Sequence, residues 1–344
     1  MTKPKTDFET ARVNLSDEAV MVTGGTGSFG RYFVKAVMER HRPKRLIVFS
    51  RDEAKQYDMA QGFTPEENKT LRFFIGDVRD CDRLEMAMRE IDIVVHAAAL
   101  KQVPTAEYNP FECIKTNVHG AEHVVQAALN NQVESVIALS TDKAVNPINL
   151  YGASKLAADK IFVAANNLSG NIGTHFAIVR YGNVLGSRGS VVPLFEKCMA
   201  EGAESLPITD PRMTRFWITL EMGVNFVLSC LAITNGGEIF VPKIPSLTII
   251  DLATFMAPDL KHRVVGIRPG EKLHEVLITE DDARTTVELD DRFVIMPSLV
   301  FWDRSHGPDL NGTPVADDFR YASDSNRQKL DKKAFKVFMK AAGA

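Results

Sequence analysis

Short apolar runs alternate with longer amphipathic stretches along the first half of the chain. The apolar runs are rich in Val, Ile and Phe and end in small or polar residues; they cover 19–25, 44–50, 71–77, 92–99, 134–140 and 174–186. Amphipathic stretches such as 30–41 and 120–131 separate them. Because such alternation is typical of βαβ units, we predict an α/β fold with a doubly wound parallel sheet and helices on both faces.

The pattern becomes less regular after Gly189. It predicts a helix at 191–203, a loop at 206–216, a second helix near 220–233 and an apolar segment at 236–245. We expect this part to form a smaller C-terminal lobe over the carboxyl ends of the strands, where ligands bind in open α/β sheets. Beyond Pro297 the pattern is irregular.

Composition and charge exclude several classes of protein. Of the 344 residues, 45% are hydrophobic and 25% are charged, and the net charge of −3 gives no general attraction to nucleic acid or acidic membrane. The four cysteines are scattered, without a CxxC pair or a His at ligand spacing, so we expect reduced thiols and no metal. The N-terminus lacks the apolar region of a signal peptide, and no run approaches the roughly 18 apolar residues of a membrane span. We therefore expect a cytoplasmic protein that binds neither nucleic acid nor membrane.

A glycine-rich segment, TGGTGSFG at 23–30, follows the first strand and opens the first helix. Its G-x-x-G-x-x-G spacing lets the backbone turn tightly and approach a pyrophosphate at the helix N-terminus. A glycine-rich turn alone is weak evidence, but its place at the start of a βαβ series favours a dinucleotide-binding Rossmann domain. The candidate cofactor contacts here are Gly24, Thr26, Gly27, Ser28, Phe29 and Gly30.

The end of the second strand indicates which dinucleotide is bound. An NAD enzyme usually places an acid there to hold the ribose 2′-hydroxyl, whereas here Ser50 and Arg51 come first. A guanidinium matches a 2′-phosphate, so we favour NADP, although Asp52 or Glu53 also suits a hydroxyl and Arg51 also suits a solvated surface. Further cofactor contacts are expected at Asp77, Val78, Ala97, Ala98 and Lys101. Structural roles are expected for His96, Cys113 and His119.

Tyr151 and Lys155 lie four residues apart in YGASK, on the same face of a helix that begins near Leu150. A cation beside a phenol lowers its pKa toward working pH, which suits a base that assists hydride transfer from a hydroxyl. The lysine also suits contact with the nicotinamide ribose, and Thr141 suits a hydrogen bond to the same hydroxyl. The alternative is an ordinary helix with a surface lysine.

Asp142 and Lys143 form a second acid–base pair directly after the fifth strand. A lysine that acts as a base must be a neutral amine, which requires that desolvation or nearby positive charge lower its pKa. The alternative is a salt-bridged turn without a catalytic role.

Several segments together resemble a known family. TGGTGSFG, HAAALK, YGASK and RPGEK resemble the extended short-chain dehydrogenase/reductase superfamily. The longer segments 140–155, 180–195, 206–221, 236–246 and 265–285 resemble one branch of it, the inverting UDP-N-acetylglucosamine 4,6-dehydratases of pseudaminic acid biosynthesis. The resemblance covers roughly residues 19–297 and leaves out the N-terminal extension and the C-terminal tail.

This resemblance implies a reaction for both pairs. Tyr151 acts as the base while bound NADP oxidises the C4 hydroxyl of the sugar, and the new ketone acidifies the C5 proton. Lys143 is then the C5 base and Asp142 the acid for the C6 hydroxyl, which leaves as water before hydride returns to C6. Retaining relatives have Asp-Glu here, so Lys143 indicates inversion at C5. The implied product is UDP-2-acetamido-2,6-dideoxy-β-L-arabino-hexos-4-ulose, and the implied use is flagellin glycosylation.

The resemblance also implies substrate contacts and domain roles. The contacts with UDP-N-acetylglucosamine are Lys101, Lys143, Asn183, Arg188, Thr209, Arg215, Arg268 and Glu271. Arg215 suits a subunit interface equally well. The expected divisions are a polar extension at 1–17, an NADP-binding Rossmann domain at 18–186, a mainly substrate-binding lobe at 187–297 with segments that return to the Rossmann domain, and an irregular tail at 298–344. By analogy we expect a homo-oligomer, either a hexamer or a dimer.

Three alternatives stay open. A related dehydratase whose product is epimerised for capsule or O-antigen sugars shares these motifs. A simple C4-epimerase has no use for Asp142 and Lys143. A non-catalytic NADP-binding regulator often lacks the tyrosine or the lysine, and this chain has both.

Overall fold

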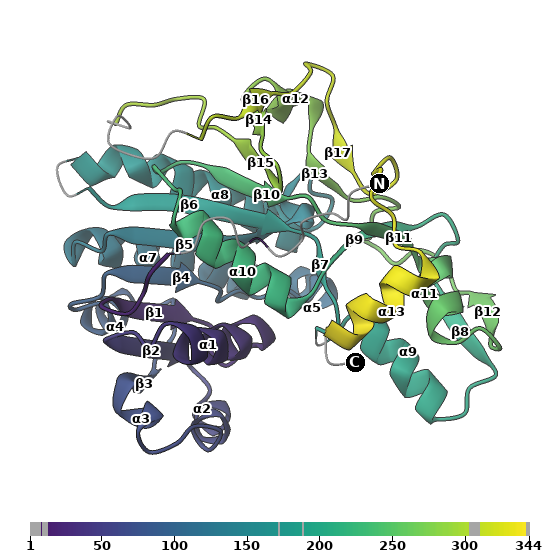
Figure 1. Cartoon of the computed structure of the whole chain (residues 1–344), viewed down its shortest axis with the longest axis horizontal. Coiled ribbons are helices and arrows are strands. Elements are labelled where there is room, and N and C mark those ends of the chain that lie inside the picture. Colours follow the sequence, from purple (N-terminus) through teal and green to yellow (C-terminus); the bar gives the residue numbers. More distant parts are fainter. Residues whose placement is uncertain (1–7, 9–12, 171–172, 188, 303–309, 342–344) are drawn as a thin grey trace.

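A central sheet of ten strands forms the body of the protein (Figure 1). The computed structural model describes residues 8, 13–170, 173–187, 189–302 and 310–341. The strand order is β16-β14-β15-β10-β6-β5-β4-β1-β2-β3, and the strands from β10 to β3 run parallel. Their bounds are β1 Ala19–Thr23, β2 Arg45–Ser50, β3 Leu71–Ile75, β4 Ile93–His96, β5 Ser135–Thr141, β6 His175–Tyr181, β10 Ile239–Pro242, β14 Thr286–Glu288, β15 Arg292–Ile295 and β16 Thr313–Pro314. The predicted parallel sheet is confirmed, and β15, β14 and β16 add an antiparallel edge that the pattern did not indicate.

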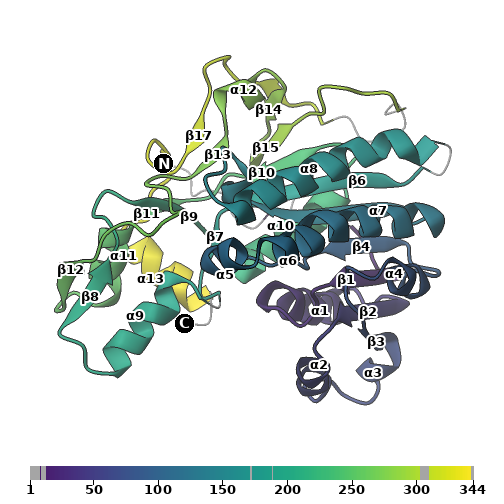
Figure 2. The same cartoon turned by 180° about the vertical axis from the view of Figure 1, so that it is seen from behind.

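Helices cover both faces of this sheet. Figure 1 shows α1 (Ser28–Arg40) and α10 (Leu220–Leu231) on one face, and Figure 2 shows α4 (Cys81–Ala87), α7 (Gly120–Asn130) and α8 (Leu150–Ser169) on the other. Strand β1 is buried along its whole length, as its continuous apolar run requires. Shorter helices fill the connections: α2 Glu53–Ala60, α3 Glu67–Thr70, α5 Val103–Tyr108, α6 Pro110–Ile114 and a π-helix at Lys115–His119. Within the described residues, no helix is long and apolar enough to cross a membrane.

A smaller lobe with its own apolar core lies beyond the carboxyl ends of the strands (Figure 1). Its helices are α9 (Val191–Ala200) and α11 (Ile249–Met256); its strands are β7 (Asn183–Val184), β8 (Ser205–Ile208), β9 (Thr214–Ile218), β11 (Ser246–Thr248) and β12 (Lys261–Val264). The predicted loop at 206–216 instead contains most of β8 and the start of β9. These strands form because each pairs with a segment distant in the sequence, which a local pattern does not reveal.

The C-terminal residues are more regular than the predicted tail. Strand β17 (Tyr321–Ala322) pairs with β13 (Val276–Ile278), α12 (Glu280–Ala283) precedes β14, and α13 (Lys332–Ala341) packs on the lobe. Phe335 of α13 is buried, with its ring centroid 5.6 Å from that of Phe255. The expectation of an irregular tail does not hold for these residues, because the apolar positions Phe335, Phe338 and Met339 recur at helical spacing.

Candidate active site

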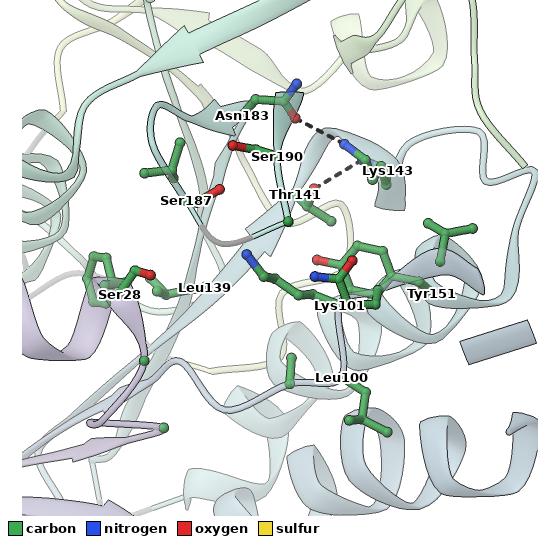
Figure 3. Close-up of a pocket in the computed structure, with 18 of the residues that line it drawn as sticks. Ser28, Leu100, Lys101, Leu139, Thr141, Lys143, Tyr151, Asn183, Ser187 and Ser190 are labelled. Carbon is green, nitrogen blue, oxygen red and sulfur yellow. Dashed lines mark hydrogen bonds between the residues drawn. The ribbon is translucent and has the colours of Figure 1, made fainter. Parts of the chain in front are cut away.

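One large cavity lies between the carboxyl ends of the parallel strands and the lobe. Its volume is about 1090 Å³, and its wall combines the ends of β1, β2, β4 and β5 with residues of β7, α9 and β9. Figure 3 shows Lys101, Thr141, Lys143, Tyr151 and Asn183 around the same space. Since a typical ligand pocket measures roughly 300–1,000 Å³, this cavity lies just above the upper end of that range.

The glycine-rich loop forms a cradle at one end of the cavity. At Gly24 the backbone is left-handed, with φ of 65°, and a Cβ there would lie 2.9 Å from the backbone of Ala98. A Cβ on Gly30 would lie 2.5 Å from Gly25, so helix α1 starts in direct contact with the loop. Gly27 begins α1 without a side-chain cap, which leaves its first N–H groups to an anion. All six predicted loop contacts line the cavity, so the cradle fits the pyrophosphate of a dinucleotide.

Arg51 is the accessible cation at the end of β2. Its side chain is 58% exposed and lies 3.5 Å from the carboxylate of Asp77. Asp52 caps α2 by accepting from the backbone N–H of Lys55 and also pairs with the Lys55 ammonium group. The acid that suits a ribose hydroxyl is therefore engaged by its own helix, whereas Arg51 faces the cavity. The other predicted contacts, Ser50, Asp77, Val78, Ala97, Ala98 and Lys101, line the same wall.

Tyr151 lies in the first turn of α8. Asn149 caps this helix by accepting from the N–H of Gly152 at 2.7 Å. Burial raises the pKa of Tyr151 to about 12, and the positive charge of Lys143 offsets only part of this effect. The expected lowering of the Tyr151 pKa is thus absent in the protein alone, because desolvation outweighs the effect of the nearby cation.

Lys155 is buried one turn further along α8 and also lines the cavity. Burial lowers the pKa of its ammonium group, while the charge of Asp159 acts in the opposite direction. Asp159 accepts a hydrogen bond from the Ser140 hydroxyl at 2.8 Å and one from Arg180 at 3.4 Å. Lys155 therefore lies between the cavity and a buried hydrogen-bond network formed by Ser140, Asp159 and Arg180.

Asp142 and Lys143 share a 3-10 turn after β5 (η2, Asp142–Ala144). Asp142 is fully buried, and its Oδ1 accepts from the Thr141 hydroxyl at 2.8 Å and from Lys143 Nζ at 3.0 Å. Lys143 Nζ also donates to Asn183 at 3.2 Å and lines the cavity (Figure 3). Lys143 and Thr141 therefore reach the cavity, and Asp142 lies behind them.

The charges around Lys143 differ from those that the sequence analysis required. Burial by itself disfavours the ammonium group, but the carboxylates of Asp142 and Glu275 outweigh this effect and raise the pKa of Lys143. The positive charge of Arg215 acts the other way. The expectation of a lowered Lys143 pKa is therefore wrong for the protein alone, in which Lys143 is a cation held near two carboxylates.

The predicted substrate contacts come from both sides of the cavity, with Lys101 and Lys143 after β4 and β5 of the sheet and the other described contacts on lobe segments. Lys101, Lys143, Asn183, Thr209, Arg215, Arg268 and Glu271 line its wall, and Arg188 lies outside the described residues. Arg268 is 61% exposed and lies 3.7 Å from the Glu271 carboxylate. Arg215 is buried and donates to the carbonyls of Thr214, Lys272 and Leu273, so it belongs to the interior of the site and not to an outer surface.

Four polar atoms of the wall are buried without a hydrogen-bond partner among the described residues. They are Thr116 Oγ1, Ser190 Oγ, Trp217 Nε1 and Glu271 Oε2. Because an unpaired buried polar group is unfavourable, these atoms point to a bound ligand. The sequence pattern did not single out Thr116, Ser190, Trp217 or, behind Lys143, Glu275. Its one signal for Glu275 is an acid directly before a buried apolar run.

The residues expected to be structural lie away from this wall. His96 is buried in β4 with Nδ1 2.8 Å from the Thr23 hydroxyl, and burial, with a smaller effect of Lys155, lowers its pKa to about 3. Cys113 is buried, and His119 pairs with Glu122 at 3.2 Å. No group of His, Cys, Asp or Glu in the described part of the chain is arranged to hold a metal ion.

Known proteins share both the sequence and the fold. The polysaccharide biosynthesis protein family matches residues 20–297, which include every cavity residue named above. The inverting UDP-N-acetylglucosamine 4,6-dehydratase of Campylobacter jejuni is 56% identical over 312 residues, which cover 89% of this chain and 92% of that protein. The UDP-glucose 4-epimerase of Rickettsia canadensis is 44% identical, with 81% of this chain and 83% of that protein covered.

A solved structure extends the likeness to three dimensions. The dTDP-glucose 4,6-dehydratase of Streptomyces venezuelae, determined with NAD bound, has a TM-score of 0.67 and 25% identity. The match covers 82% of this chain and 93% of that one. Together with the family match from β1 to the end of β15, these findings show that the chain belongs to the polysaccharide biosynthesis protein family.

Proposed function

We propose that this chain is an NADP-dependent UDP-N-acetylglucosamine 4,6-dehydratase that inverts C5 of the sugar. The observation that carries the proposal is that two proton-handling groups, the Tyr151 hydroxyl and Lys143 Nζ, line one cavity. Oxidation of the C4 hydroxyl requires only the first group, whereas elimination of water across C5 and C6 requires the second. The name of the Campylobacter relative supports the same reaction.

The cofactor end of the cavity suits NADP. The 24–30 loop would hold the pyrophosphate, Arg51 the 2′-phosphate and Lys155 the nicotinamide ribose. The bound dinucleotide would supply the hydride chemistry, namely oxidation at C4 and reduction at C6. The NAD of the Streptomyces structure supports a nicotinamide dinucleotide in this fold. The choice of NADP rests on Arg51, which is 58% exposed beside Asp77, and on Asp52, which caps α2.

Tyr151 takes the proton of the C4 hydroxyl. Thr141, which hydrogen-bonds the phenol, also suits the substrate oxygen. The positive charge of Lys143 favours the phenolate, so a cationic Lys143 assists this first step.

Lys143 then acts at C5 and C6. The C4 ketone acidifies the C5 proton, and the neutral amine of Lys143 takes it once the ammonium group has passed its own proton to a carboxylate. Because Asp142 is enclosed, its proton reaches the C6 hydroxyl through Lys143 or Thr141, and the hydroxyl leaves as water. After hydride has returned to C6, C5 takes a proton from solvent on the opposite face, which is the position that deuterated water labels.

The remaining assignments follow the same geometry. We assign NADP binding to 18–186 and most substrate binding to 187–297, with Asn183, Arg268 and Glu271 at the nucleotide sugar. We also propose that the protein forms a homo-oligomer, either a hexamer or a dimer.

Product analysis in deuterated water tests the reaction. After incubation with UDP-N-acetylglucosamine, NMR should show a 4-keto-6-deoxy sugar with deuterium at C5. A C4-epimerised sugar that keeps its C6 oxygen would contradict the proposal and favour a second candidate, the epimerase activity that the Rickettsia relative's name indicates. Absence of any turnover with NADP bound would favour the non-catalytic regulator.

Two substitutions separate the two steps. We expect Tyr151→Phe to lower reduction of the bound cofactor and product formation together, by about 10²- to 10⁴-fold. Lys143→Ala should lower product formation by about the same factor, whereas cofactor reduction should persist at a lower rate because the charge of Lys143 no longer favours the phenolate. Lys160→Ala removes an exposed lysine of α8, the helix that carries Tyr151, and is the matched control.

A further inference from the structure

Glu275 lies directly behind Lys143, one residue before β13. Its side chain is 2% exposed, and its carboxylate is surrounded by three cations. Oε1 lies 3.8 Å from Lys143 Nζ and 3.7 Å from Arg215 Nε, and Oε2 lies 3.8 Å from Lys272 Nζ. A second buried carboxylate therefore faces the lysine that reaches the cavity.

Charge, and not hydrogen bonding, holds this carboxylate in place. All three distances are longer than a hydrogen bond, and Oε2 is buried with no hydrogen-bond partner in the described part of the chain. Asp142 differs, because its Oδ1 accepts two hydrogen bonds. A buried, unsatisfied carboxylate contributes poorly to stability, so its position points to a role in the site.

The backbone of Glu275 is fixed by the C-terminal segment. Its N–H donates to the Ser323 hydroxyl at 2.9 Å, and its carbonyl accepts from the Ser323 N–H at 2.8 Å. The Ser323 hydroxyl also lies 2.7 Å from the hydroxyl of Thr214, the neighbour of Arg215. The segments that carry Glu275 and Arg215 are therefore tied to one another, and the carboxylate stays close to Lys143.

We propose that Glu275 is a positioning residue for Lys143: its carboxylate holds Nζ at the cavity wall and controls how readily the amine loses its proton. The proposal rests on the proposed function. In the ionised cluster three cations, Lys143, Arg215 and Lys272, stand against two carboxylates, Asp142 and Glu275. Loss of Glu275 leaves Asp142 as the single anion beside Nζ, so the position of the ammonium group is fixed from one side only and the hold on its proton weakens.

The charged and titratable groups that face Lys143 come from five segments. They are Asp142 in its own turn, Glu275 and Lys272 before β13, Arg215 in β9, Tyr151 in α8 and Lys101 after β4. Of these, Asp142 and Glu275 raise the pKa of Lys143, against the effect of burial. Removing the charge of Glu275 lowers the Lys143 pKa, so the neutral amine forms at lower pH. The acidic limb of the elimination step should then move to lower pH.

Glu275→Gln in the NADP-loaded enzyme tests this assignment with UDP-N-acetylglucosamine as substrate. We expect cofactor reduction to continue at the wild-type rate while deuterium exchange at C5 falls by about 10-fold or more, less than the 10²- to 10⁴-fold loss for a general base itself. The acidic limb of C5 exchange should shift to lower pH, and Glu275→Asp should restore part of the rate. If the Gln variant does not fold, the Asp variant, which keeps the charge but withdraws the carboxylate from Nζ by one methylene group, should still show a smaller fall in C5 exchange with cofactor reduction unchanged.

Glu238→Gln is the matched control, since it removes an equally buried carboxylate between α10 and β10, away from the cavity wall. It should leave the pH profile unchanged. If Glu275→Gln lost cofactor reduction and C5 exchange in parallel, with an unshifted pH profile, Glu275 would have only a structural role and the proposal would be overturned. Wild-type rates and a wild-type pH profile in that variant would also overturn it. Failure of the proposed function is seen separately, as absence of the 4-keto product with the wild-type protein.

Discussion

Tyr151 and Lys143 each hold a proton that they must give up before they act as bases. Burial raises the pKa of Tyr151 to about 12, and the charge of Lys143 lowers it in part. Lys143 itself stays cationic, because Asp142 and Glu275 outweigh the desolvation that disfavours its charge and raise its pKa. The two requirements fit the order of the proposed reaction. A charged Lys143 assists Tyr151 during oxidation, and Lys143 loses its proton only afterwards, when C5 becomes acidic.

Arg51 is the cation on which the proposed preference for NADP rests. We expect Arg51→Ala to weaken NADP binding by about 10- to 100-fold, the equivalent of one charge-assisted hydrogen bond, and to leave NAD binding unchanged. Isothermal titration calorimetry with both dinucleotides measures the difference. Arg89→Ala, at an exposed arginine outside the cavity wall, is the control. Equal losses for NAD and NADP would contradict the assignment.

His96 makes stability depend on pH. Its pKa is about 3 in the folded protein and near 6.5 in the unfolded chain, because burial disfavours the imidazolium form. Its contribution is complete above the unfolded pKa and is lost as the pH falls from about 6.5 toward 3, since only the unfolded chain takes up the proton. Between pH 7 and about pH 5, wild type should therefore lose about 2 kcal/mol of unfolding free energy more than His96→Asn.

Urea denaturation at the two pH values measures this loss. His119→Asn, at a half-exposed histidine, should behave as wild type does. An equal loss in wild type and in His96→Asn would show that other groups account for the pH dependence.

At the scale of helices and strands, the N-terminal ends of α8 and α1 position the reacting groups and the cofactor loop. Asn149 caps α8 through the Gly152 N–H and also donates from Nδ2 to the carbonyl of Gly270 at 2.8 Å. One side chain therefore ties the helix that carries Tyr151 to the segment that carries Arg268 and Glu271. The start of α1 is built differently, by direct contact of glycines with no side chain between them.

Two glycine substitutions, one in α1 and one in α10, test the importance of the close glycine contact at the start of α1. In Gly30→Ala the new methyl group meets the backbone of Gly25, and we expect a loss of about 1–3 kcal/mol in unfolding free energy together with weaker NADP binding. In Gly223→Ala, within α10, the methyl group meets no atom within 4 Å, and the gain in helix propensity should stabilise the protein by about 0.5–1 kcal/mol. Chemical denaturation and NADP titration of both variants measure the two effects. Tolerance of Gly30→Ala would mean that the loop moves away from α1 at little cost.

At the scale of the whole molecule, the sequence pattern predicts the parallel part of the central sheet, whereas the strands of the lobe form only by pairing with segments distant in the sequence. Strands β1 to β6 were predicted because each is a short apolar run, and all of them except the edge strand β3 are mostly buried. Strands β8 and β9 were not, because they are short and depend on partners elsewhere in the chain. The predicted residues that line the cavity followed from motifs, but Thr116, Ser190 and Trp217 of the same wall belong to no motif. Glu275 faces Lys143 only once β13 has paired with β17 and Ser323 has joined both to β9.

The C-terminal segment thus supports the site from behind, and Phe335 is the side chain that holds α13 on the lobe. It is 3% exposed and packs on Phe255, so Phe335→Ala should cost about 3–5 kcal/mol of lobe stability and weaken binding of the UDP-sugar more than binding of NADP. Val337, two residues further along α13, is 67% exposed, and Val337→Ala should change stability by less than about 0.5 kcal/mol. Differential scanning calorimetry with each ligand in turn measures both effects. If the two variants were equally stable, α13 would not be a fixed part of the lobe. If Phe335→Ala weakened the binding of both ligands equally, the lobe and the sheet would unfold as one unit. Only a lobe with a separate stability can lose the sugar site while the NADP site persists.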